Sequence, residues 1–79
     1  MGVGTFDLEQ VYLYPNPVND ILYVNSNIDD LYITLYDLNG RELHKTIQKE
    51  IPMKNLSSGI YIVKMESKSQ NIYKRIIKR

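Results

Sequence analysis

His44 is the residue best suited to acid–base chemistry, because it is the only histidine of the chain and imidazole titrates near neutral pH. A catalytic histidine needs a nucleophile or an orienting carboxylate within hydrogen-bonding reach. No candidate nucleophile lies beside His44 in the sequence, and His44 follows the turn residues Asn39-Gly40 in a polar, strand-like segment. We therefore predict that His44 is a solvated strand residue and that the chain is not an enzyme.

Metal and cofactor chemistry has little support in the sequence. The chain has no cysteine, so it can form no disulfide, and a single histidine argues against a zinc site. Asp29-Asp30 lies close to Asn25 and Asn27, but the spacing lacks the pattern of a calcium loop, and turn formation by these side chains explains the cluster more simply. Gly59 belongs to no phosphate-binding glycine pattern. We predict no cofactor and no metal.

The basic charge is confined to one end of the chain. The net charge of the 79 residues is +1, yet residues 1–66 carry five basic and nine acidic residues, a balance of −4. Residues 67–79 carry five basic and no acidic residues: Lys68, Lys74, Arg75, Lys78 and Arg79. Basic patches can bind phosphates, but here the charges flank Ile76-Ile77 on a short strand, so we predict no nucleic-acid partner. No run of about 18 apolar residues exists, and we predict no membrane span.

Most of the chain has the alternating apolar pattern of short β-strands. Turn residues recur every 8–12 positions, which is the pattern of an antiparallel β-sandwich. Six residues are predicted to lie in its core: Leu22, Val24, Ile33, Leu35, Tyr61 and Val63. Leu43 and Ile47 are expected to anchor the segment 41–49. The strands are expected at residues 9–14, 20–26, 31–38, 41–49, 51–56, 59–66 and 72–78.

Proline and glycine mark the turns. Pro15 and Pro17 lack an N–H group and should form a rigid elbow at the start of a strand. Asn39-Gly40 predicts a type I′ hairpin turn with positive φ at both residues, and Gly59 is expected to permit a tight turn into the strand that holds Tyr61. Seven tyrosines form a possible sugar-binding platform, although their alternation suggests that several pack inside.

Four motifs occur in this order: Tyr14-Pro15-Asn16-Pro17-Val18-Asn19-Asp20, Asp37-Leu38-Asn39-Gly40-Arg41, Leu56-Ser57-Ser58-Gly59-Ile60-Tyr61-Ile62-Val63 and Lys74-Arg75-Ile76-Ile77-Lys78. Together they resemble the type A C-terminal sorting domain of proteins exported by the type IX secretion system of Bacteroidetes. Each motif is weak alone, and the four in register are specific. Arg79, beyond the usual final lysine, is a departure from the family pattern, and residues 1–11 carry no family motif.

The resemblance implies that residues 12–79 form a small immunoglobulin-like sandwich that serves as an export address. Such a domain takes a cargo, attached at its N-terminal side, from the periplasm through an outer-membrane translocon to the surface or the medium. A cell-surface peptidase then removes it, with the cut expected before Tyr14, and can couple the cargo to lipopolysaccharide. Residues 1–11 are expected to be the join to the cargo or an added segment.

Two sets of residues follow from this resemblance. The translocon is expected to recognise Lys74, Arg75, Ile76, Ile77, Lys78 and Arg79. Structural roles are expected for Pro15, Asn16, Pro17, Asp20, Gly40, Gly59 and Tyr61. The alternative is an adhesion-like or carbohydrate-binding β-sandwich, which predicts recognition by loops or by an aromatic face.

Overall fold

The computed structural model of the chain describes residues 11–26, 30–68 and 70–79, which hold seven β-strands and no helix. This confirms the all-β prediction, and four of the seven strands lie inside the expected segments. The strands are β1 (Tyr12–Tyr14), β2 (Ile21–Asn25), β3 (Tyr32–Tyr36), β4 (Glu42–Thr46), β5 (Glu50–Pro52), β6 (Gly59–Ser67) and β7 (Gln70–Lys78).

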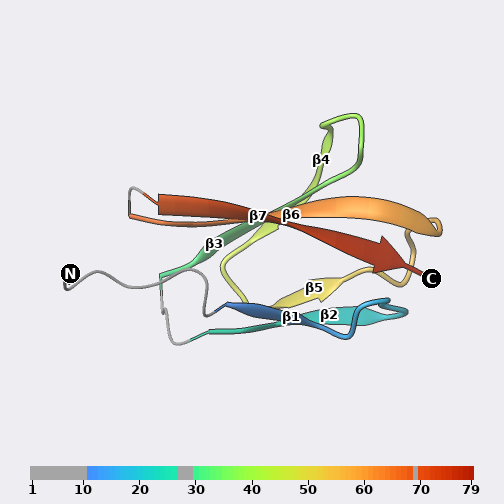
Figure 1. Cartoon of the computed structure of the whole chain (residues 1–79), viewed down its shortest axis with the longest axis horizontal. Coiled ribbons are helices and arrows are strands. Elements are labelled where there is room, and N and C mark those ends of the chain that lie inside the picture. The colour runs from blue at the N-terminus through green and yellow to red at the C-terminus, as the bar shows by residue number, and fades with distance from the viewer. Residues whose placement is uncertain (1–10, 27–29, 69) are drawn as a thin grey trace.

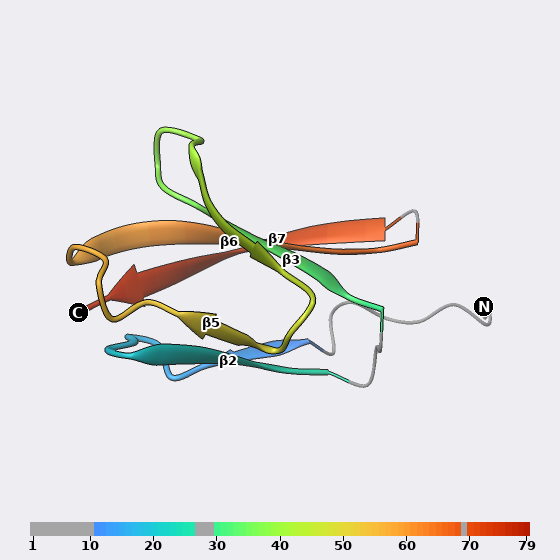
Figure 2. The ribbon, with the colours of Figure 1, turned by 180° about the vertical axis from the view of Figure 1, so that it is seen from behind.

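The strands form two antiparallel sheets that stack face to face (Figures 1 and 2). The smaller sheet has the order β1-β2-β5 and the larger sheet has the order β4-β3-β6-β7. Each of β2 and β3 is paired with a strand that lies far along the chain, β5 and β6 respectively. The fold is therefore a small antiparallel β-sandwich, as predicted.

The core lies between the sheets and is built by strand alternation. In β2, Leu22 and Val24 point inward while their neighbours are exposed. In β3, Ile33 and Leu35 point inward, and Thr34 between them is also buried. All six predicted core residues are buried, and each large apolar side chain contributes roughly 1.5–3 kcal/mol by its burial. Among the described residues, the buried core consists of Val11, Val18, Leu22, Val24, Leu31, Ile33, Leu35, Ile51, Met53, Tyr61, Val63, Met65 and Ile76.

One expected anchor is wrong. Leu43 packs, partly buried, against the core, but Ile47 is 65% exposed. The reason is that β4 ends at Thr46, and the next residues cross from the larger sheet to the smaller one. Lys49 secures this crossing, because its carbonyl accepts a hydrogen bond from the N–H of Val24 (2.9 Å) and its Nζ donates to the carbonyl of Ser26 (2.7 Å).

β6 and β7 form the longest hairpin of the sandwich. Their pairing runs without a register shift from Gly59↔Lys78 to Ser67↔Gln70. β7 begins two residues earlier than the turn residues around Lys68 suggested, so nine residues of each strand are paired. This hairpin carries the basic end of the chain along one edge of the larger sheet.

Candidate functional site

The first and last motifs of the chain meet at the end of β7. The side-chain Oδ1 of Asn16 accepts a hydrogen bond from the N–H of Ile77 (3.1 Å), although the two residues are 61 positions apart. Val18 N–H donates to the carbonyl of Ile77 (2.8 Å), and Arg79 N–H donates to the carbonyl of Val18 (2.9 Å). Val18 thus forms a short parallel bridge to the strand end, and we call this contact the terminal junction.

The prolines explain how the chain reaches this position. β1 ends at Tyr14, and the two X-Pro bonds that follow, at Pro15 and Pro17, are both cis. Because proline cannot donate to a sheet ladder, the chain leaves the smaller sheet here. Beyond the elbow, Val18 is fully buried between the sheets, and the carbonyl of Asp20 accepts a hydrogen bond from the N–H of Met53 (2.7 Å). The elbow is therefore fixed to both sheets.

The terminal residues alternate between core and solvent. Ile76 and Lys78 are buried, and the Nζ of Lys78 donates to the carbonyl of Arg79 (3.1 Å). Arg75, Ile77 and Arg79 are exposed, and Lys74 is half-buried. Of the six residues expected to be recognised, two thus face the interior of the sandwich. Recognition of the exposed ones stays a prediction.

The third motif borders the same end of β7. Gly59 pairs with Lys78 and has φ +152°, and Tyr61 pairs with Ile76. The buried Tyr61 donates its hydroxyl to the carbonyl of Ser57 (2.6 Å), which fastens the preceding turn to the start of β6. Gly59 and Tyr61 therefore have backbone and packing positions, and the structural roles expected for them stay a prediction.

The second motif forms the β3–β4 turn, but the turn type differs from the prediction. Gly40 has φ +84°, whereas Asn39 is not at positive φ. Gly40 N–H donates to the carbonyl of Asp37 (3.0 Å), and Asp37 N–H donates to the carbonyl of Arg41 (3.1 Å). The central residues are therefore Leu38 and Asn39, and Gly40 supplies the left-handed residue that follows, as in three-residue hairpin loops.

The Asp37 carboxylate explains why this turn is preferred over type I′. Its Oδ1 accepts hydrogen bonds from the N–H groups of Asn39 and Arg41, both at 2.9 Å, and its Oδ2 lies 3.2 Å from Nε of Arg41. The backbone N–H of Arg41, that of Asn39 and the Arg41 guanidinium hold the pKa of Asp37 below its ordinary value. The ionised carboxylate of Asp37 thus organises the loop.

Gly40→Val should destabilise the hairpin by about 1–3 kcal/mol, because a β-branched residue is strained at positive φ. No atom lies within 4 Å of the position that a Cβ would take, so backbone strain alone is responsible. Thermal unfolding followed by circular dichroism measures the effect. Leu38→Val is the matched control at an exposed position of ordinary φ, and equal melting temperatures for the two variants would contradict the assigned turn.

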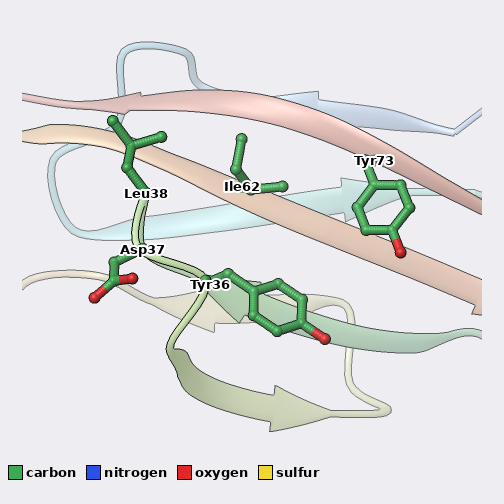
Figure 3. A pocket seen from close by; sticks show the side chains of 6 residues that line it. Tyr36, Asp37, Leu38, Ile62 and Tyr73 are labelled. Atoms are coloured by element: carbon green, nitrogen blue, oxygen red, sulfur yellow. The ribbon is translucent and has the colours of Figure 1, made fainter.

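The outer face of the larger sheet has a shallow apolar depression of about 290 Å³ beside this turn (Figure 3). In Figure 3, Ile62 lies between Leu38 of the turn and Tyr73 of β7. The other lining residues are Tyr36, Asp37 and Gly40. Asp37 supplies one carboxylate to this depression, and its hydrogen-bond partners, Asn39 and Arg41, belong to the turn itself.

The structure places the other candidate groups apart from this depression. His44 lies in β4 opposite Leu35. The suggested calcium cluster is partly outside the described residues, since Asn27 and Asp29 are not described, and Asp30 Oδ1 accepts a hydrogen bond from Ser67 Oγ (3.0 Å). Within residues 11–26, 30–68 and 70–79, no three metal-binding side chains gather, and no helix is long and apolar enough to cross a membrane.

The tyrosines are mostly outside, contrary to the expectation that several pack inside. Among the described tyrosines only Tyr61 is buried. Tyr12, Tyr14 and Tyr23 share the outer face of the smaller sheet, and the rings of Tyr14 and Tyr23 stack with centroids 5.7 Å apart. These three tyrosines alternate along β1 and β2 with the side chains that face the core, so strand alternation exposes them to solvent.

Residues 12–79 match the family of secretion system C-terminal sorting domains. The match covers most of the chain, so the chain belongs to this family, and the resemblance predicted from the four motifs is confirmed. No curated protein matches the chain. The domain is thus a sorting signal of type IX secretion, and its attachment to a cargo and its export to the surface or the medium follow from that membership.

Proposed function

We propose that the domain carries an N-terminally attached cargo from the periplasm through the type IX translocon of the outer membrane. A cell-surface peptidase then removes the domain by a cut before Tyr14. The observation that carries the proposal is the family match over residues 12–79. The terminal junction supports it, because the first and last motifs form one surface although they are far apart in the chain.

The proposed recognition surface is the exposed part of the terminal junction. It consists of Ile77 of β7 and Arg79 just after the strand, together with the neighbouring Arg75 and the exposed Pro15 and Pro17 of the elbow. Charged groups around a small apolar contact favour a specific encounter with an oppositely charged receptor. Since the hydrogen bonds of Asn16 and Val18 hold the strand end, the receptor meets this surface only on the folded domain.

The double variant Ile77→Ser/Arg79→Glu should reduce export of a reporter fusion at least tenfold, because it removes the exposed apolar side chain and reverses the terminal charge. Both side chains are exposed, so folding should persist. Reporter activity in the medium and on intact cells, relative to total activity, measures export. The control Ile47→Ser/Lys54→Glu likewise removes an exposed isoleucine and reverses a positive charge, at exposed positions elsewhere. Equal export by the two variants would rule out recognition at the junction.

The second candidate function, carbohydrate binding, is favoured by the stacked Tyr14 and Tyr23 on the outer face of the smaller sheet. Flat aromatic faces of this kind can stack on sugar rings. The paired substitution Tyr14→Ala/Tyr23→Ala separates the two functions. It should leave export intact if the junction is recognised, and it should abolish retention on a polysaccharide column if this face binds sugar.

A further inference from the structure

Within the described part of the chain, three of the four sheet edges are protected against strand addition, and the edge formed by β7 is not. β5 is three residues long and ends at Pro52, which has no N–H group, and β1 is equally short. β4 has an irregular register against β3 between Leu35 and Tyr36. β7 is nine residues long and pairs regularly with β6 throughout. In Figure 1 it runs along the edge of the larger sheet, so it is the edge best suited to accept another strand.

The hydrogen bonds of Ile77 reveal which backbone groups of β7 point away from β6. Its N–H and carbonyl bond to Asn16 and Val18, so they face outward. Because backbone groups alternate along an antiparallel strand, those of Asn71, Tyr73 and Arg75 also face outward. Among the described residues these outward groups have no hydrogen-bond partner. The terminal junction therefore covers the end of the edge and leaves its middle open.

The open part of the edge is basic and lacks neutralising partners. Lys74 and Arg75 lie on opposite faces of β7, and neither forms an ion pair with a described residue. Tyr73, on the same face as Arg75, is 57% exposed. A strand that suits this edge carries an acidic residue opposite Arg75 and an apolar residue opposite Tyr73.

Basic side chains on an edge can also serve only to prevent pairing. They prevent pairing with a second copy of β7, because the two basic edges repel each other. They do not prevent pairing with an acidic strand, because they attract it. Lys74 is half-buried, and the paired residues of β7 include no proline and no register shift. The charge thus selects the partner and leaves the backbone groups available.

We propose that the edge of β7 from Asn71 to Arg75 accepts an extended acidic segment of a protein of the export machinery as an additional strand. The proposal rests on the proposed function, since it names how the last strand is recognised. The added strand pairs with the outward backbone groups of Asn71, Tyr73 and Arg75, and its acidic side chains face Lys74 and Arg75. The terminal junction sets the limit of the pairing at Ile77.

Tyr73→Pro tests the backbone pairing, because it removes one outward N–H group and leaves the hydrogen bonds to β6 in place. The chain is fused behind a signal peptide and a reporter in cells with the type IX system. Tyr73→Pro should lower export at least tenfold, while Tyr73→Ala, which keeps the N–H group, should retain at least half. A folded Tyr73→Pro variant that is exported normally would overturn the proposal, as would an equal loss with Tyr73→Ala.

Two further variants keep the proposal testable. If Tyr73→Pro lowers the melting temperature of the purified chain, Asn71→Pro makes the same change at the next outward position. Arg75→Glu keeps every backbone group, and it should also reduce export at least tenfold. Normal export of Arg75→Glu would exclude an acidic partner. If the purified chain forms dimers and Tyr73→Pro abolishes them, the edge pairs with a second copy of the chain instead. Failure of the unaltered fusion would instead count against the proposed function itself.

Discussion

Deleting residues 74–79 should unfold the domain and abolish its export together. The deletion removes the buried Ile76, whose burial contributes roughly 1.5–3 kcal/mol. It also removes the partners of both hydrogen bonds of Val18, worth about 1 kcal/mol each. A small domain has roughly 5 kcal/mol of stability in total. A thermal scan of the truncated chain by circular dichroism should therefore show no cooperative transition.

Deletion of Arg79 alone is the control for that truncation. It removes the hydrogen bond from Arg79 to Val18 and leaves Ile76 and Lys78 in place, so the domain should stay folded with a lower melting temperature. A chain lacking residues 74–79 that melts cooperatively near the temperature of the intact chain would contradict the assigned role of Ile76. Since folding and recognition share these residues, exposed point substitutions test recognition more cleanly than truncation.

Val18→Asp should destabilise the domain by at least about 3 kcal/mol, because it places a carboxylate without a partner between the two sheets. The same residue connects the elbow to the last strand, so the terminal junction should be lost as well. Urea unfolding followed by circular dichroism measures the change in the free energy of unfolding. Export of a reporter fused to this variant should fall to the level of a reporter without the domain.

Asn19→Asp is the matched control for Val18→Asp. It adds the same charge one residue later, at an exposed position, and should change stability by no more than about 0.5 kcal/mol. If Val18→Asp were as stable as Asn19→Asp, Val18 would not be part of the core and the terminal junction would be wrong. The comparison therefore separates the effect of placing a carboxylate at the buried Val18 from the effect of adding a negative charge to the elbow.

The sequence was sufficient to predict the fold because strand alternation has a short range. Leu22 and Val24 alternate with exposed neighbours, and this period of two identifies both the strand and its inward face. Gly40 was correctly assigned a positive φ from its place after a polar turn residue. The family could be predicted too, since its motifs are contiguous segments whose order can be checked without coordinates.

Other features depended on contacts that local patterns do not contain. Ile47 looked like a core residue, but its position depends on where β4 ends and the chain crosses between sheets. The type I′ prediction considered Asn39-Gly40 alone and missed the Asp37 carboxylate, whose hydrogen bonds select another turn.

The terminal junction was the largest omission from the sequence prediction. Asn16 is held between two prolines and bonds to a residue at the other end of the chain. Prolines fix the local direction of a chain but do not specify its distant partner. The one indication of this contact in the sequence was that the first and last motifs of the family occur in the same chain.

The measurement that tests the central claim most directly is the fraction of a reporter that leaves the cell when residues 12–79 are fused to its C-terminal side, behind a signal peptide. In cells with the type IX system, most of the reporter should appear on the surface or in the medium. In a mutant without the translocon it should remain in the periplasm. A reporter that stays in the periplasm of competent cells, although the domain is folded, would contradict the sorting function.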